Sequence, residues 1–432
     1  MAVATAMPTA VRELHGLRYY SWPFTAFMVA SVLAVVLAGE QADRRGPRPV
    51  LLVGFGVFCA GLVGAGVTGQ MAVFVAARAV QGLGVGLLVV PLFVVIAEVF
   101  DDATRPRVFA VVSAAWVLPA LIGPIVAGLV TQHLTWRLAF LGLVPLVLVG
   151  AVLVLRALRR HTTLGSSDPV GSERRVGVAG RGSRAPYALL VAVGLVAVQY
   201  AGQPGHRSAP VLALPGLVTL WWAARRILPA GTVRLRSGLP ATVGYRGLLS
   251  GAFFGVEAFM PLTLTQLHGY SPTAAGVPLT VGALGWSAGS WFQGRRPHAP
   301  RHALVRAGCA LIGAGATGLV SIAFAGSPGW LAVPAWAISG TGMGLAVPSV
   351  SVLLMRLSPA AERGSHSAAL QISDMLASAV TIGLGGVLLA RIVPLPAAIT
   401  TVDLTMAAIA GLGVLFAGRL RAPAGHSAAG ER

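Results

Sequence analysis

The segment Gly39-Glu40-Gln41-Ala42-Asp43-Arg44-Arg45-Gly46-Pro47-Arg48 is a cluster of charged and turn-forming residues between two long apolar stretches. The chain as a whole is 56% hydrophobic and only 10% charged. A charged side chain in the hydrocarbon of a bilayer is costly, so this cluster must lie outside the lipid. We therefore interpret it as a short loop between two membrane-spanning helices.

Apolar runs recur along the whole chain, whose mean hydropathy is +0.79. Each run has about twenty residues, enough to cross the hydrocarbon layer. Spanning backbone must satisfy its own hydrogen bonds, and the alternation expected of a barrel is absent, so we expect helices. About thirteen complete spans are expected, at residues 19–39, 49–68, 71–98, 109–130, 139–155, 187–202, 209–224, 246–266, 274–292, 303–325, 330–357, 367–389 and 399–420.

The net charge of +19 comes from arginine, since the chain contains no lysine. The arginines gather in every second loop, such as 44–48, 156–184, 225–246 and 295–306. This alternation is typical of cytoplasmic loops and places the C-terminus in the cytoplasm of a multi-pass protein of the bacterial plasma membrane. It argues against nucleic-acid binding, which would need a basic folded face.

The loops and spans divide the chain into parts. Residues 1–14 are apolar but too short to span, and we expect them to be the outer half of a first helix whose beginning is missing, so that the complete protein has about fourteen spans. The expected parts are an N-terminal helical bundle (1–155, first helix partial), a cytoplasmic Arg/Gly/Ser-rich linker (156–186), two inserted helices (187–225), a cytoplasmic loop (226–245), a C-terminal helical bundle (246–420) and a cytoplasmic tail (421–432).

An internal repeat relates the two bundles. The glycine motif Gly82-Leu-Gly84-Val-Gly86 is echoed by Gly340-Thr-Gly342-Met-Gly344. A fainter echo of Arg45-Gly-Pro-Arg48 occurs at His298-Ala-Pro-Arg301. Repeated halves with a substrate route between them are typical of secondary transporters.

Several motifs carry a family resemblance. They are Gly39-x-x-x-Asp43-Arg44-x-Gly46-x-Arg48, Arg78-x-x-Gln81-Gly82-x-Gly84, Pro119-x-x-x-Gly123-Pro124-x-x-x-Gly128 and Trp136-Arg137-x-x-Phe140. With them the chain resembles the major facilitator superfamily, in particular its drug:proton antiporter branch with fourteen helices. The resemblance implies an all-α polytopic membrane protein with two six-helix bundles and two extra helices inserted between them.

The resemblance also assigns roles to two motifs. In the family, the charged loop docks on neighbouring helix ends at the cytoplasmic face and stabilises one access state. The residues expected to form this gate are Gly39, Asp43, Arg44, Gly46 and Arg48, with Glu98 and Asp101 as partners. The alternative is a solvated loop that only sets topology. Pro119, Gly123, Pro124 and Gly128 form an antiporter-type motif that lets helices approach and bend, or that serves packing alone.

Four charged residues lie well within expected spans, away from their ends, and a proton-coupled transporter needs such groups. Glu257 and Asp374 lie near mid-bilayer, and Asp403 is nearer the outer end. Arg78, beside Gln81 and Gly82, carries a permanent charge because guanidinium does not deprotonate in proteins. We expect these residues to couple protons or bind substrate. The alternatives are helix-packing acids and an arginine that reaches hydrated space.

We therefore predict secondary active transport, with proton-coupled efflux of small amphipathic or hydrophobic compounds such as drugs or antibiotics. The alternatives are a carrier for a specific metabolite and a truncated, non-functional homologue. We expect no enzyme activity, no metal site and no cofactor, with a proton gradient as energy source. The expected partners are a small-molecule substrate, protons and the lipid bilayer, with no nucleic acid, and the expected state is a monomer.

Overall fold

A computed structural model describes residues 2–99, 104–162, 185–203, 209–296, 298–324, 326–359 and 362–420. Every regular element in these ranges is helical. The α-helices are α1 (Ala2–Glu13), α2 (Trp22–Arg45), α3 (Pro47–Val67), α4 (Met71–Val99), α5 (Arg105–His133), α6 (Leu138–Leu141), α7 (Leu143–Thr162), α8 (Ala185–Gly202), α9 (Ala209–Ile227), α10 (Leu239–Glu257), α11 (Met260–Leu267), α12 (Pro272–Gly294), α13 (Arg301–Leu319), α14 (Ala332–Leu357), α15 (Arg363–Arg391) and α16 (Leu395–Phe416).

Each expected span coincides with helix, and two of the spans are broken. The span at 139–155 divides into α6 and α7, and the span at 246–266 divides into α10 and α11. In the described residues, 10 helical segments are long and apolar enough to cross a membrane, and Leu118–His133 is a shorter apolar helix. The chain is thus a multi-pass helical membrane protein, and the number of its crossings stays a prediction.

Three boundaries of the expected spans are wrong by six or seven residues. The helix of the first span ends at Arg45 instead of residue 39, and the helix of the fifth span ends at Thr162 instead of residue 155. The span expected to begin at Arg246 begins instead at Leu239, the first residue of α10. Gly238 adopts a positive φ of 88°, and Pro240 occupies the first turn, where a missing N–H costs nothing. This start signal outweighs the charge of Arg246, which therefore lies within the helix.

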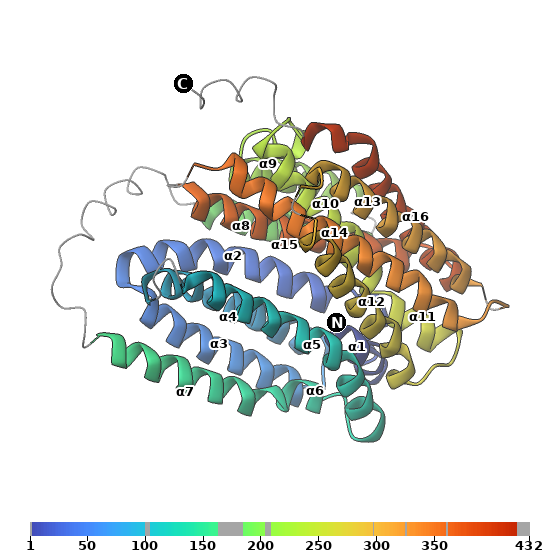
Figure 1. The fold of residues 1–432 in the computed structure, drawn as a ribbon. Helices are drawn as coiled ribbons and strands as arrows, with labels where there is room; N and C mark the ends of the chain where they lie inside the picture. Colours follow the sequence, from blue (N-terminus) through green and yellow to red (C-terminus); the bar gives the residue numbers. More distant parts are fainter. Residues whose placement is uncertain are drawn as a thin grey trace.

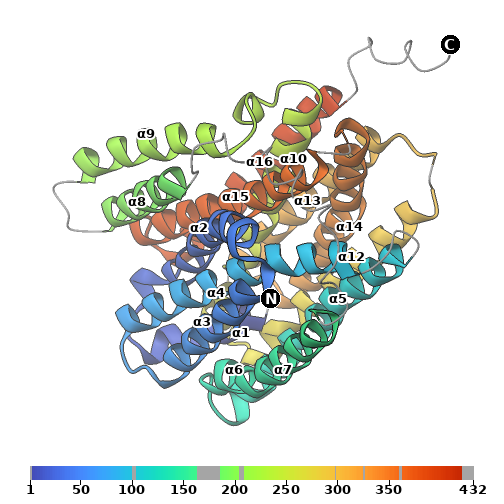
Figure 2. The same ribbon diagram turned by 90° about the vertical axis from the view of Figure 1, so that its left-hand side faces the viewer.

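The helices form two bundles with a helix pair beside them. Figure 1 shows α2, α3, α4 and α7 on one side and α10 with α12 to α16 on the other. The inserted helices α8 and α9 pack on each other, and α8 also contacts α2 and α15, one from each bundle (Figure 2). Small residues permit the α8–α9 contact, because a Cβ on Gly194 would lie 2.8 Å from the Gly216 carbonyl oxygen.

The glycine repeat performs the same packing task in both bundles. A Cβ on Gly82 of α4 would lie 2.1 Å from the carbonyl oxygen of Phe27 on α2. A Cβ on Gly340 of α14 would lie 2.0 Å from the carbonyl oxygen of Gly282 on α12. The other glycines continue the pattern: Gly84 and Gly342 meet α3 and α13, and Gly86 and Gly344 meet α2 and α12. The predicted repeat is therefore a repeated three-helix contact.

Arginines stacked on exposed aromatic rings mark one end of the molecule. The guanidinium carbon of Arg295 lies 3.8 Å from the Trp291 ring centroid, and that of Arg225 lies 4.4 Å from the Trp221 centroid. The same pairing occurs in Arg226 on Trp222, Arg296 on Phe292 and Arg419 on Phe416. All five pairs lie at the ends of α9, α12 and α16. Arginines beside exposed aromatic rings are typical of a membrane interface, and we call this the arginine-rich end.

Contacts between the two bundles gather toward the opposite end. The Tyr20 hydroxyl donates to the Ala258 carbonyl over 2.9 Å, and the Thr273 hydroxyl donates to the Gln132 side chain over 2.7 Å. A Cβ on Gly128 would lie 2.6 Å from the Thr273 Cα, so α5 and α12 are in close contact there. These contacts join the two bundles on the side away from the arginine-rich end.

Candidate substrate cavity

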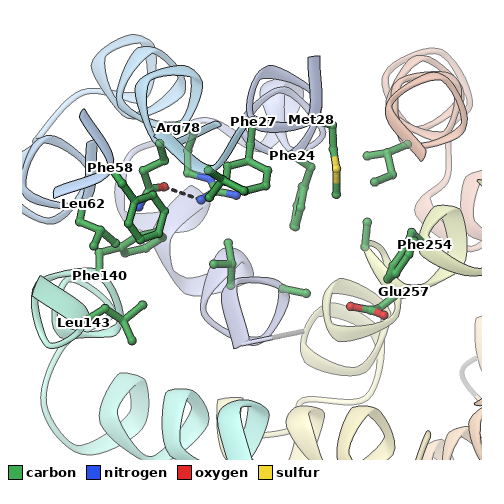
Figure 3. A pocket seen from close by; sticks show the side chains of 16 residues that line it. Phe24, Phe27, Met28, Phe58, Leu62, Arg78, Phe140, Leu143, Phe254 and Glu257 are labelled. Carbon is green, nitrogen blue, oxygen red and sulfur yellow. Dashed lines mark hydrogen bonds between the residues drawn. The ribbon is translucent and has the colours of Figure 1, made fainter. Parts of the chain in front are cut away.

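A cavity of about 270 Å³ lies between the two bundles (Figure 3). Its walls come from α1, α2, α3, α4, α6 and α7 on one side and from α10 and α15 on the other. The lining residues are Val3, Ala4, Phe24, Phe27, Met28, Phe58, Leu62, Arg78, Gln81, Val85, Phe140, Leu143, Phe254, Glu257, Ala258 and Ile382. Three predicted site residues, Arg78, Gln81 and Glu257, thus face one space.

Arg78 provides a fixed positive charge in this cavity. Its side chain is 6% exposed, donates from Nη1 to the Gln81 side chain, and lies 4.3 Å above the Phe27 ring centroid. The Nε atom has no hydrogen-bond partner, and no carboxylate of the described residues forms an ion pair with this arginine. The sequence predicted the charge in the membrane, and the structure adds that its partners are uncharged.

Glu257 lies at a break in its helix. It is the last residue of α10, and α11 begins at Met260. Pro261 follows four positions later, where its missing N–H and its ring prevent the helical hydrogen bond to the Glu257 carbonyl. The Tyr20 hydroxyl bonds the interrupted backbone at Ala258. Broken helices at mid-depth are tolerated where the backbone is enclosed by protein or lines a cavity, as it does here.

Glu257 itself is 4% exposed and lies across the cavity from Arg78, on the opposite bundle (Figure 3). Aromatic side chains form much of the cavity wall, and Phe24 lies between these two charged groups (Figure 3). Phe24 and Phe27 come from α2, Phe58 from α3 and Phe254 from α10. The sequence did not identify these aromatic residues, because a phenylalanine in an apolar span looks the same whether it faces lipid, core or cavity. The arrangement suits a flat apolar body with polar ends.

The other two predicted acids do not line the cavity. Asp374 of α15 forms an ion pair with Arg246 of α10, with 3.3 Å between Oδ2 and Nη2. Asp403 is 4% exposed, in the middle of α16. Sequence reasoning missed Arg246 as an intramembrane charge because it placed the start of that helix too late.

The prediction that residues 39–48 form a loop is wrong: α2 continues to Arg45 and α3 begins at Pro47, so only Gly46 separates the two helices. Gly46 ends α2 with a positive φ of 78°, which favours glycine, and Pro47 opens α3. Arg44 is exposed, Gly39 and Arg48 are half-buried, and a Cβ on Gly39 would meet nothing within 4 Å. The side chains of Asp43 and Glu98, and the whole of Asp101, lie outside the described residues. The latch therefore stays a prediction.

The antiporter-type motif lies on α5, which is continuous from Arg105 to His133 despite its prolines. Gly128 allows the close approach of Thr273, and a Cβ on Gly276 of α12 would lie 2.8 Å from the Pro124 carbonyl oxygen. The contact thus joins the two bundles. Pro119 is exposed, and Gly123 is half-buried on the same helix. Whether the motif specifies export stays a prediction.

A polar cluster away from the cavity was also missed. Glu13, at the end of α1, accepts hydrogen bonds from the Trp136 indole over 2.6 Å and from Arg137. Arg137 also donates to the Thr68 carbonyl at the end of α3 over 3.1 Å. These residues are far apart in the sequence, so only the fold reveals the cluster. The Arg137 hydrogen bond is the main cause that lowers the pKa of the Glu13 carboxyl below its ordinary value of 4.5.

We expect Glu13→Gln to destabilise the protein at neutral pH by no more than about 1 kcal/mol, since the pair is solvent-exposed and screened. A lowered folded pKa stabilises the fold above the unfolded value, and that stabilisation is lost as pH falls through the folded value. The difference in melting temperature between wild type and variant should therefore be constant above about pH 5 and shrink below the ordinary pKa of 4.5. A difference that grows on acidification would refute this role.

Comparison with known proteins identifies relatives of the chain. The family model described as Major Facilitator Superfamily matches residues 1–382. A probable multidrug-efflux transporter of Mycobacterium tuberculosis (strain H37Rv) is 27% identical over 396 residues, covering 88% of this chain and 82% of that protein. The multidrug transporter protein MdtP of Bacillus subtilis (strain 168) is 27% identical over 368 residues, covering 82% of this chain and 65% of that protein.

Solved structures share the fold. The human organic anion transporter MFSD10 is 16% identical, with a TM-score of 0.64 over 96% of both chains. An auto-inhibited peptide transporter of the POT family is 18% identical, with a TM-score of 0.65 over 98% of this chain and 96% of that chain. At these identities the likeness extends to the arrangement of the helices.

Proposed function

Because this chain belongs to the Major Facilitator Superfamily, a family of transporters, we propose that it exports small amphipathic or hydrophobic molecules in exchange for protons. Two relatives whose names state multidrug efflux or transport support the substrate class. The direction of transport and the coupling to protons are parts of the proposal.

The observation that carries the proposal is the composition of the cavity. A transporter that alternates between two access states needs a site that both bundles share. Here one bundle contributes Arg78 and Gln81, and the other contributes Glu257. The Glu257 carboxyl group lies at a helix break, and the fixed positive charge of Arg78 lies across the cavity. Such a carboxyl group can bind or release a proton when the substrate or the bundles move, because its surroundings change. Aromatic walls supply apolar contact without a strict shape requirement.

The same proposal assigns the remaining parts. The α2–α3 junction, residues 39–48, acts as a latch at the arginine-rich end, which faces the cytoplasm together with the C-terminus of a monomer. Closure of that end would bring the α2–α3 junction toward the C-terminal bundle. The contacts of Tyr20 with Ala258 and of Thr273 with Gln132 would then have to open on the other side.

The test is transport by the purified full chain in liposomes with an imposed pH gradient. A panel of amphipathic dyes is supplied outside, and their uptake into the lumen is followed by fluorescence. We expect uptake when the lumen is acidic, and its collapse when a protonophore dissipates the gradient. Uptake that persists with the protonophore, or a panel that is not transported at all, would contradict proton-coupled transport of this class of compounds.

A further inference from the structure

The buried charge of Arg78 forms no ion pair with a carboxylate of the described residues. Its neighbours are the Gln81 amide and the Phe27 ring, and neither carries a charge. A buried cation is costly unless it is paired, and removal from water is compensated only by a good geometry with an opposite charge. The site therefore has an unmet requirement for an anion.

The geometry of the cavity shows where such an anion would come from. Arg78 lines the cavity, and its Nε atom has no hydrogen-bond partner. A guanidinium binds carboxylates through two parallel hydrogen bonds, which a ligand entering the cavity could satisfy. A carboxylate of the protein would neutralise Arg78 permanently, whereas a carboxylate on a ligand would neutralise it only in the loaded state.

The opposite wall of the cavity carries an acidic residue. Glu257 lies across the cavity from Arg78, with Phe24 and Phe254 beside the space between them (Figure 3). A cationic group placed at Glu257 would compete with a proton for the same carboxylate. An anionic group at the same place would instead favour the protonated acid and would oppose exchange.

We propose that the ligands of this cavity include compact aromatic zwitterions, whose anionic group binds Arg78 and whose cationic end lies toward Glu257. The inference deepens the proposed function and depends on it only for the direction of transport. Binding at equilibrium, without a gradient, tests it separately.

The experiment uses two dyes that differ at one group. Rhodamine 110 carries a free carboxylate beside its cationic ring system, and rhodamine 123 is its methyl ester. Binding of each dye to the purified full chain in lipid nanodiscs is measured by fluorescence anisotropy at neutral pH. A charge-assisted hydrogen bond in a buried site should make the acid bind about tenfold to a hundredfold more tightly than the ester.

The variant Arg78→Gln should remove this preference by weakening the acid alone. Arg78→Lys keeps the charge without the paired hydrogen bonds and should retain part of the preference. The matched control is Arg301→Gln. Arg301 is 9% exposed and likewise donates to a glutamine, Gln293, but it does not line the cavity. Its removal should leave the ratio of the two affinities unchanged.

Wild-type protein that binds the ester as tightly as the acid would overturn the proposal without any variant. A wild type that prefers the acid, combined with an Arg78→Gln variant that loses affinity for both dyes equally, would also overturn it. Arg78 would then act on the fold rather than on the carboxylate. Gradient-driven transport of rhodamine 123 alone would leave the proposed function standing and the zwitterion inference refuted.

Discussion

Glu257→Gln is expected to reduce gradient-driven transport to the level of empty liposomes while dye binding remains. Glutamine keeps the size and hydrogen-bonding capacity of the side chain but cannot release a proton. The variant can still bind and exchange substrate, but a proton gradient no longer drives substrate transport. Transport into an acidic lumen and dye exchange without a gradient, measured on the same liposomes, separate the two effects.

The matched control for this prediction is Asp403→Asn. Both acids are 4% exposed and both lie within helices, but Asp403 does not line the cavity. If proton coupling requires a carboxyl group in the cavity, Asp403→Asn should therefore retain gradient-driven transport. Full gradient-driven transport by Glu257→Gln, or equal losses in both variants, would show that proton coupling does not depend on the carboxyl in the cavity.

Gly82→Ala is expected to lower stability by about 1–3 kcal/mol, the usual cost of overpacking. The new Cβ would lie 2.1 Å from the carbonyl oxygen of Phe27, and a backbone atom cannot move aside as a side chain can. The contact of α2 with α4 would have to widen beside the cavity, so dye binding should weaken as well. Thermal unfolding of the variant in detergent, followed by Trp fluorescence, measures the first effect.

Gly411→Ala is the control, since a Cβ at that position of α16 would meet nothing within 4 Å. Alanine favours helix over glycine by about 1 kcal/mol, so the control should be unchanged or more stable. Because the repeat places Gly340 in the same contact of the other bundle, Gly340→Ala should resemble Gly82→Ala in stability. A Gly82→Ala protein as stable as Gly411→Ala would refute the repeated close contact.

Much of the fold was predictable because membrane-spanning helices can be recognised in a sequence by their length and apolar composition. Every expected span coincides with helix, and the glycine motifs at 82–86 and 340–344 correctly indicated equivalent contacts. The helix break at Glu257 was missed, although Pro261 stands four residues later. The start of α10 was misplaced because charge was weighed above the Gly238–Pro240 signal, which also concealed Arg246 inside the helix.

The candidate site was predictable only where a residue is conspicuous in the membrane. Arg78 and Glu257 stand out as charges in apolar spans, and both line the cavity. Asp374 stands out equally, but its pairing with Arg246 depends on the packing of α10 against α15. The cluster of Glu13, Trp136 and Arg137 also depends on tertiary packing. Such contacts between distant positions leave no periodic signal in a single sequence.

Proton release on substrate binding tests the central claim most directly, which is that substrate and proton share Glu257. Rhodamine 123 is added to wild-type protein in weakly buffered solution, and the pH change is recorded alongside the amount of dye bound. We expect protons to be released in proportion to bound dye by the wild type, and no release by Glu257→Gln at equal occupancy. Saturable binding to the wild type without proton release would contradict the claim.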